Sequence, residues 1–189
     1  RYFVLGAIYS IYFVFMFVAL KYTTTVSTAA IFTLLPLFAA LLERLFLKKS
    51  SPALIWVALI LSGMGALWII FEGSINGLFQ FRFEEGEAIF LVGTICYASY
   101  AIIQPKLFEG ENIYVTTLGV LAAGSIILAI SLILQQSSFI VHKITFEVFW
   151  VIFYLAIFAS IGSITCLNYA SPRLSAPVVS AYTLLVPLW

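Results

Sequence analysis

Long stretches without a charged side chain are the feature that most restricts how this chain of 189 residues can fold. A helix needs about 20 apolar residues to cross the roughly 30 Å hydrocarbon core of a bilayer. Apolar residues make up 63% of the chain and charged residues 9%, against about 45–50% and about 25% in soluble domains. We therefore expect an all-α, polytopic helical membrane protein. The uncharged runs, each close to a membrane-spanning length, are 2–20, 22–42, 53–71, 88–105, 112–141, 148–172 and 174–189.

The runs predict seven spans, of which the last is incomplete. They are residues 3–20, 25–47, 53–71, 87–107, 113–135, 147–168 and 174–189. If the chain begins on the cytoplasmic side, six basic residues lie in cytoplasmic loops and three lie outside. This distribution favours that orientation, because Lys and Arg in short loops are retained in the cytoplasm. The inside set is Arg1, Arg44, Lys48, Lys49, Lys106 and Arg173, and the outside set is Lys21, Arg82 and Lys143.

The longest polar connection, residues 72–86, combines a turn signal with an alternating pattern. Asn76-Gly77 is typical of a turn, and Phe79, Phe81 and Phe83 then alternate with polar residues. The alternation fits either a short strand or an interfacial segment. We expect a surface-lying linker between two halves of the protein.

Two proline-containing runs repeat one another. "IFTLLPLF" covers residues 31–38, and "YTLLVPLW" covers residues 182–189. Extending the match pairs spans 3–20 and 25–47 with spans 147–168 and 174–189. Three spans lie between the copies, so the second copy enters the membrane inverted, a signature of secondary transporters. Pro36 and Pro187 are the expected helix kinks.

The quoted segments resemble a known family. "FVALKYTTTVSTAAIFTLLPLFAALLERLFLKK" (17–49) is similar to the third and fourth helices of an EamA-type unit of the drug/metabolite transporter superfamily. "EGEAIFLVGTICYASYAIIQPKLF" (85–108) is similar to the opening helix of the second unit. One departure is that Lys48 and Lys49 stand where the family often has Gly-Glu, so no role of that glutamate is transferred.

The resemblance implies ten helices in two inverted five-helix units. The chain would then be a fragment covering about the third to the ninth helix. Residues 1–71 would be the C-terminal part of the first repeat, 72–86 the inter-repeat loop, and 87–189 the second repeat, truncated in its fourth helix.

Polar and aromatic residues that share helix faces are the candidates for a substrate cavity, because a bilayer retains polar groups mainly where they face a cavity or a partner helix. Gly93, Tyr97, Tyr100 and Gln104 form one stripe, and the resemblance places their helix beside the cavity. The alternatives are that the tyrosines pack between helices and that Thr28 bonds back to its own helix. The substrate-binding candidates are Tyr9, Tyr12, Thr28, Phe32, Tyr97, Tyr100 and Gln104.

For the other polar residues in the spans, a role in helix packing or helix ends fits better than a role in substrate binding. Ser160 and Ser163 fit a small-residue packing face, and Asn168 fits a helix end. Glu43 fits an interfacial ion pair with Arg44 or Lys48 better than a proton relay. The two cysteines, Cys96 and Cys166, fit core positions better than a disulfide. A single histidine, His142, and the absence of Asp leave no metal site and no His-based catalytic pair.

These patterns predict a secondary transporter of a small organic solute working by alternating access, not an enzyme, in a bacterial inner membrane. No cofactor and no nucleic-acid partner are expected. The expected partners are the solute and the lipid bilayer, and a homodimer is one alternative for the assembly. A non-transporting membrane scaffold is the main alternative, and an intramembrane enzyme would need a nucleophile or carboxylate pair that is not visible. The substrate, the direction of transport and ion coupling are not encoded in these patterns.

Overall fold

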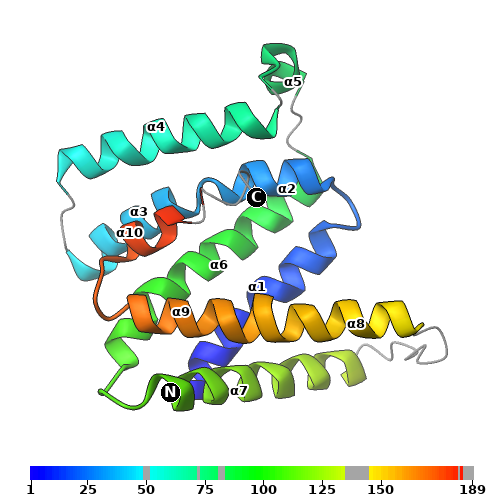
Figure 1. Cartoon of the computed structure of the whole chain (residues 1–189). Coiled ribbons are helices and arrows are strands. Elements are labelled where there is room, and N and C mark those ends of the chain that lie inside the picture. Colours follow the sequence, from blue (N-terminus) through cyan, green and yellow to red (C-terminus); the bar gives the residue numbers. More distant parts are fainter. Residues whose placement is uncertain (49–51, 72, 81–83, 135–144, 183, 185–189) are drawn as a thin grey trace.

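The computed structural model describes residues 1–48, 52–71, 73–80, 84–134, 145–182 and 184. All regular secondary structure in these ranges is helical (Figure 1). In chain order the helices are α1 (Tyr2–Ala19), α2 (Thr25–Phe32), α3 (Leu35–Leu47), α4 (Ala53–Ile70), α5 (Ile75–Gln80), α6 (Glu85–Leu107), α7 (Ile113–Leu134), α8 (Phe146–Tyr154), the π-helix η2 (Leu155–Gly162), α9 (Ser163–Ala170) and α10 (Ala176–Ala181).

Five helical segments of the described chain are long and apolar enough to cross a membrane, with mean hydropathy between 1.6 and 2.2. They agree closely with five of the seven spans expected from the sequence and confirm an all-α, polytopic membrane protein. A sixth helix, α4, carries a shorter apolar segment, Ala53–Gly65. The five long segments are Tyr2–Ala19, Thr25–Leu47, Glu85–Leu107, Ile113–Ile133 and Phe146–Ala170.

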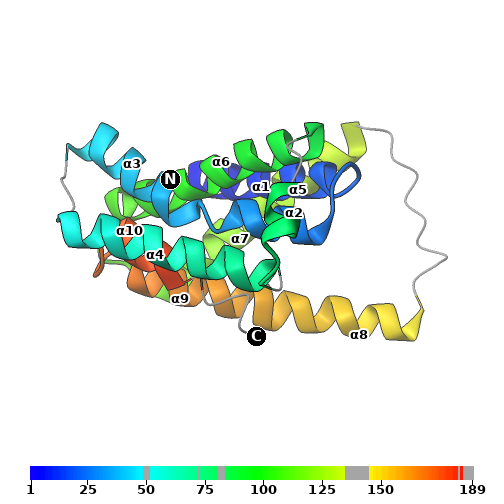
Figure 2. The ribbon, with the colours of Figure 1, turned by 90° about the horizontal axis from the view of Figure 1, so that it is seen from above.

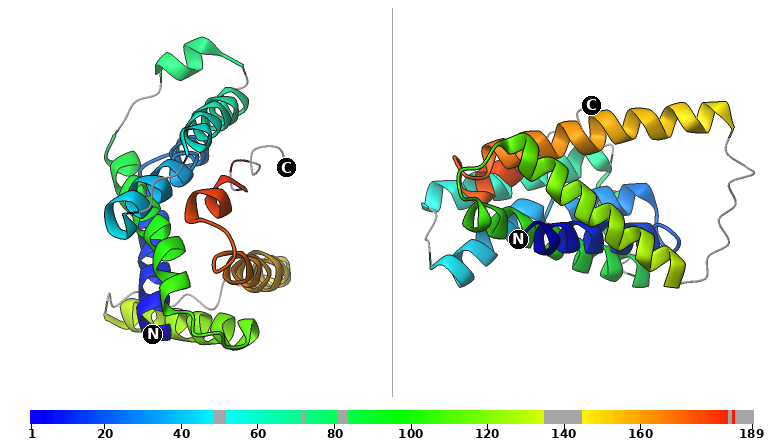
Figure 3. Two further views of the ribbon diagram at one scale, coloured as in Figure 1. Left: turned by 90° about the vertical axis from the view of Figure 1, so that its left-hand side faces the viewer. Right: turned by 90° about the horizontal axis from the view of Figure 1, so that it is seen from below.

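The helices are arranged around α1 and α6, which pack along one another. α7 packs on the other side of α1, and α2 and α3 pack on α6. The segments α8, η2 and α9 form one continuous rod, and its α9 end packs on α7 while α8 diverges from α7 (Figures 1 and 2). Seen along the bundle, α7, α1, α6, α3 and α4 follow an arc, with α10 and the rod on one side of it (Figure 3, left).

The crossing of α1 and α7 depends on small residues. A Cβ atom on Gly6 would lie 2.8 Å from both the Cβ atom of Ala123 and the backbone nitrogen of Gly124. The Ser10 hydroxyl donates a 3.0 Å hydrogen bond to the Gly124 carbonyl oxygen within the same buried contact. Glycine at position 6 therefore lets the two backbones approach closely enough for this bond, as is common between membrane helices.

A similar contact fixes the start of α6 against the α1–α2 turn. A Cβ atom on Gly86 would lie 2.8 Å from the Cβ atom of Thr23. The adjacent Glu87 carboxylate accepts a hydrogen bond from the Thr23 hydroxyl and another, at 3.0 Å, from the backbone N–H of Glu84. Gly86 thus provides the space for the turn, and Glu87 satisfies a backbone donor at the helix end.

The connection at residues 72–86, expected to be a surface-lying linker, contains a short helix. Residues 75–80 form the short helix α5, where the Ser74 hydroxyl accepts a hydrogen bond from the Gly77 backbone N–H at 3.1 Å. The interpretation as a strand is therefore wrong for these residues, because a local Ser cap stabilises a helical turn. Residues 81–83, which carry the rest of the alternation, lie outside the described ranges.

The predicted second span, residues 25–47, is divided into α2 and α3. The helix breaks at Thr33 and Leu34, and Pro36 lies in the first turn of α3, where proline fits because its missing N–H needs no partner. Pro187 lies outside the described residues. α3 packs against α10, the helix at the start of the segment that the sequence repeat pairs with it.

Several basic residues predicted to share one membrane side are also close in space. Arg1 pairs with Glu109 and, at 2.9 Å, with Glu111 in the α6–α7 connection. Lys106 and Arg173 line a common cleft at the same ends of α6 and α9. The end of the bundle that carries these residues is called the basic end below.

Candidate functional site

Five aromatic side chains from three helices meet inside the bundle and form what we call the aromatic cluster. Its members are Tyr9 and Tyr12 of α1, Phe32 of α2, and Tyr97 and Tyr100 of α6. The ring centroids of Tyr12 and Tyr97 are 4.8 Å apart, and those of Tyr9 and Tyr100 are 5.8 Å apart. Phe32 lies 6.0 Å from Tyr97. All five are substrate-site candidates from the sequence, and the structure brings them together.

Helical spacing and one glycine explain this convergence. Tyr97 and Tyr100 are three residues apart on α6, so both face α1. Gly93, one turn earlier, has the Phe15 Cβ atom only 2.9 Å from where its own Cβ would be. The absence of a side chain at Gly93 brings α1 close to α6, and the paired tyrosines of the two helices then come into contact.

Tyr100 also begins a buried hydrogen-bond chain across three helices. Its hydroxyl donates to Oδ1 of Asn168 at 2.8 Å, and Nδ2 of Asn168 donates to the Thr117 hydroxyl at 3.2 Å. All three side chains are buried. Asn168 lies in the last turn of α9, in agreement with its interpretation as a helix-end residue, and its amide also joins α9 to α6 and α7.

Beside this chain lies a buried polar layer, made of Gln104, Thr116, Thr117 and Asn168. Tyr100, Val120 and Ile164 pack in one apolar cluster, and Gln104, Thr116 and Asn168 each lie one helical turn from a member of it. Gln104 is 1% exposed, yet neither its amide oxygen nor its amide nitrogen has a hydrogen-bond partner among the described residues. The Thr116 hydroxyl is also unpartnered there. Such groups destabilise a fold, so they suggest a role other than packing.

A cavity of about 320 Å³ adjoins the aromatic cluster at Tyr9. It lies between α1, α7 and η2, and its volume falls at the lower end of the range for small-molecule sites. No charged side chain lines it; its polar groups are the hydroxyls of Tyr9, Ser10, Ser125 and Ser160. We call it the η2 cavity. It offers an apolar space with a few neutral hydrogen-bonding groups.

The π-helical segment η2 supplies one wall of this cavity through Ala156, Ser160 and Ile161. The sequence predicts a packing face for Ser160 and Ser163, but none of the η2 residues is buried and Ser163 is exposed. The packing interpretation is therefore wrong here. π-Helical turns are frequent at functional sites, but sequence periodicity at 3.6 residues does not reveal them.

The remaining candidates lie apart from the cluster. Thr28 is buried, but its hydroxyl donates to the Thr25 carbonyl oxygen at 2.9 Å, which matches the alternative that it bonds to its own helix. Glu43 is buried and lines the cleft shared with Lys106 and Arg173. Both cysteines are free thiols, and Cys166 is exposed rather than in the core. His142 lies outside the described residues, within which no metal-binding group of His, Cys, Asp or Glu occurs.

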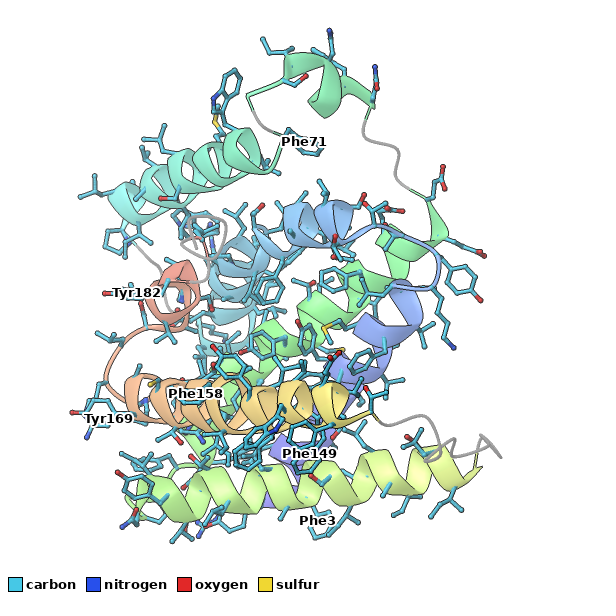
Figure 4. All side chains as sticks on the ribbon, turned by 45° about the vertical axis from the view of Figure 1, so that its right-hand side comes forward. Phe3, Phe71, Phe149, Phe158, Tyr169 and Tyr182 are labelled. Atoms are coloured by element: carbon cyan, nitrogen blue, oxygen red, sulfur yellow. The ribbon has the colours of Figure 1, made fainter. Side chains whose placement is uncertain are left out.

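Other aromatic residues lie on the outer surface of the bundle. Figure 4 labels Phe3, Phe149, Phe158, Tyr169 and Tyr182, which are all between 52% and 67% exposed. Apolar outward-facing rings suit a lipid environment. The aromatic cluster is distinguished from them by its half-buried and buried rings that contact one another across helices.

The fold and the cluster together define a multi-pass α-helical membrane protein with an aromatic cluster in its interior. A model of the EamA-like transporter family matches residues 85–189, which is more than half of the chain. The chain belongs to the EamA-like transporter family.

A curated relative is similar over most of this chain. It is the "Uncharacterized transporter YyaM" of Bacillus subtilis (strain 168), which is 27% identical over 172 residues. The match covers 91% of this chain and 56% of the relative, so the chain spans about half the length of that protein. The family and this relative support a transporter role in general terms.

Proposed function

We propose that the protein is a secondary transporter that moves a small organic solute across the membrane by alternating access. Its solute path includes the aromatic cluster and the η2 cavity. The protein is not an enzyme, and it resides in a bacterial inner membrane, consistent with its Bacillus relative.

The observation that carries this proposal is the position of four tyrosine side chains among membrane-spanning helices. The rings of Tyr9, Tyr12, Tyr97 and Tyr100 lie against one another, and Tyr9 borders the η2 cavity. Placing polar hydroxyl groups within a bilayer is costly unless they meet a partner or a solute. A neutral or amphipathic solute with an aromatic or apolar body matches such a lining.

The division of the chain supports alternating access around this path. In our proposal residues 1–71 and 87–189 belong to two inverted repeats joined by 72–86. The family model begins at residue 85, at the start of α6. The break before Pro36 lies in a span of the first copy of the repeat, and the π-helix η2 lies in a span of the second copy. Irregular helices near a central site are typical of secondary transporters.

The test is transport by the full-length protein in proteoliposomes against a panel of metabolites and amphipathic compounds. For any substrate found, Tyr97→Ala and Tyr12→Ala should lower transport about tenfold or more, because each removes a ring from the centre of the cluster. Tyr97→Phe keeps the ring and separates the role of the hydroxyl from that of the ring.

The matched control is Tyr154→Ala, which removes an exposed tyrosine outside the cluster. This variant should transport normally. Unchanged transport in Tyr97→Ala and Tyr12→Ala, with correctly folded protein, would contradict the proposed path. A central region that is closed to solutes in every access state would instead favour the scaffold alternative.

A further inference from the structure

A second cleft lies at the basic end of the bundle. It has a volume of about 420 Å³ and lies between the C-terminal ends of α3 and α6 and the turn that joins α9 to α10. We call it the basic-end cleft. Its charged and polar lining consists of Glu43, Lys106, Ser171, Arg173 and Ser175.

The cleft lies at the depth of the lipid headgroups. α3 ends at Leu47, α6 at Leu107 and α9 at Ala170, and the lining residues come from the last turns of these helices or the turn that follows. Since each of these helices belongs to a membrane-spanning segment, their common end lies at the membrane–water boundary. Lipid headgroups are the most abundant ligands at this depth.

Opposite charges are separated within the cleft. Glu43 is 5% exposed and contributes a carboxylate to the inner wall, whereas Lys106 and Arg173 are both exposed. The cleft therefore presents cationic groups toward the solvent side and an anionic group deeper inside. A ligand with one anionic and one cationic group is complementary to this arrangement.

The Arg173 side chain is held in position by Tyr169, which lies in the last turn of α9. Its Nη1 atom donates a hydrogen bond to the Tyr169 carbonyl oxygen at 2.6 Å, and its guanidinium carbon lies 3.9 Å from the centre of the Tyr169 ring. A guanidinium has five N–H donors, so this bond leaves several for a ligand. A fixed guanidinium loses little conformational entropy when it binds a phosphate.

We propose that the basic-end cleft binds the headgroup of a phospholipid that carries a primary amine, such as phosphatidylethanolamine. Lys106 and Arg173 bind the phosphate, and the headgroup ammonium donates to the Glu43 carboxylate. An anionic glycerol headgroup has no ammonium group that could donate to the Glu43 carboxylate. A choline headgroup has the cation but no N–H donor. The site rests on the membrane fold and is independent of the proposed transport function.

The test uses the full-length protein in detergent and measures retention of lipids of equal acyl chains by native mass spectrometry. Phosphatidylethanolamine should be retained more than phosphatidylcholine or phosphatidylglycerol. Glu43→Gln should remove most of the preference for the ethanolamine lipid. Lys106→Ala and Arg173→Ala, both at exposed positions, should weaken retention of all three lipids roughly fivefold each.

The matched controls are Glu147→Gln and Lys21→Ala, which remove exposed charges outside the cleft and should leave lipid retention unchanged. Should Glu43→Gln fail to fold, Lys106→Glu at an exposed position tests the phosphate contact, because it places a negative charge beside the phosphate and should weaken retention of all three lipids. Equal retention of the three lipids by the native protein would overturn the proposal. So would tight binding of soluble glycerophosphoethanolamine without a lipid preference, since the ligand would then be a free solute.

Discussion

The Tyr100 hydroxyl donates a 2.8 Å hydrogen bond to the Asn168 side chain, which connects α6 and α9 inside the bundle. The two residues are 68 positions apart, and the amide of Asn168 continues to Thr117 on α7. The bond attaches the rod made by α8, η2 and α9 to α6, the helix that carries two of the five rings of the aromatic cluster. Both the stability of the fold and the position of Tyr100 depend on it.

Removing this bond should destabilise the protein by an amount that depends on which partner is lost. Tyr100→Phe deletes one donor and should lower the free energy of unfolding by about 1 kcal/mol. Asn168→Ala leaves the Tyr100 hydroxyl and Thr117 without their partner and should cost about 2–3 kcal/mol. Denaturant unfolding of the full-length protein in micelles measures both. The double variant should be less destabilised than the sum of the two, since the residues share one interaction.

Gln104 provides a test that separates stability from function. Gln104→Met has a similar length but no hydrogen-bonding amide, so it should raise the free energy of unfolding by about 1–3 kcal/mol. If the amide serves the solute path, the same variant should transport more slowly. Gln80→Met, at an exposed position on α5, is the control and should change neither quantity. A stabilised variant with full transport would remove Gln104 from the site.

The contact between α1 and α7 should tolerate no side chain at position 6. Gly6→Ala places a Cβ atom 2.8 Å from Ala123 and Gly124, so we expect destabilisation of about 1–3 kcal/mol as the helices separate. Gly65→Ala is the matched control, because it makes the same substitution within a helix where no atom lies within 4 Å of the position that the new methyl group would take. There the substitution should stabilise by roughly 0.5–1 kcal/mol. Thermal unfolding of the two variants should therefore shift in opposite directions.

The η2 cavity should be accessible to water in at least one state of a working transporter. In a variant without the native Cys96 and Cys166, Ser160→Cys should react with a membrane-impermeant thiol reagent, because a thiolate forms only where water reaches it. Ile152→Cys, on the exposed apolar surface of α8, should react much more slowly in a bilayer. A transported substrate should protect the thiol introduced by Ser160→Cys from the reagent. Equal reactivity at the two positions would argue against a solute path along η2.

The local features of the sequence predicted much of the fold. The uncharged runs predicted the spans, and the helical spacing of Tyr97 and Tyr100 placed both rings on one face. The resemblance of residues 85–108 to an EamA-type helix is confirmed by the family match over residues 85–189. These features succeed because a bilayer requires every backbone polar group to be satisfied within a helix.

Other features could not be predicted because they depend on partners far away in the chain. Asn168 has no unusual spacing in its own span, and its role appears only when α9 lies against both α6 and α7. The π-helical turn that brings Ser160 to the cavity leaves no trace in a pattern with 3.6-residue periodicity. Thr28 is a cavity candidate because of its polarity, but a bond to its own helix satisfies its hydroxyl.

The sequence by itself therefore determined that the chain crosses a membrane repeatedly as helices, since apolar length and the absence of charge are local properties. It also determined which faces carry aromatic residues. Only the tertiary structure decided which faces meet: the close approaches at Gly6, Gly86 and Gly93 set the helix crossings. Those crossings bring together Tyr9, Tyr12, Phe32, Tyr97 and Tyr100, because in lipid the packing of small residues and buried hydrogen bonds, rather than exclusion from water, selects helix partners.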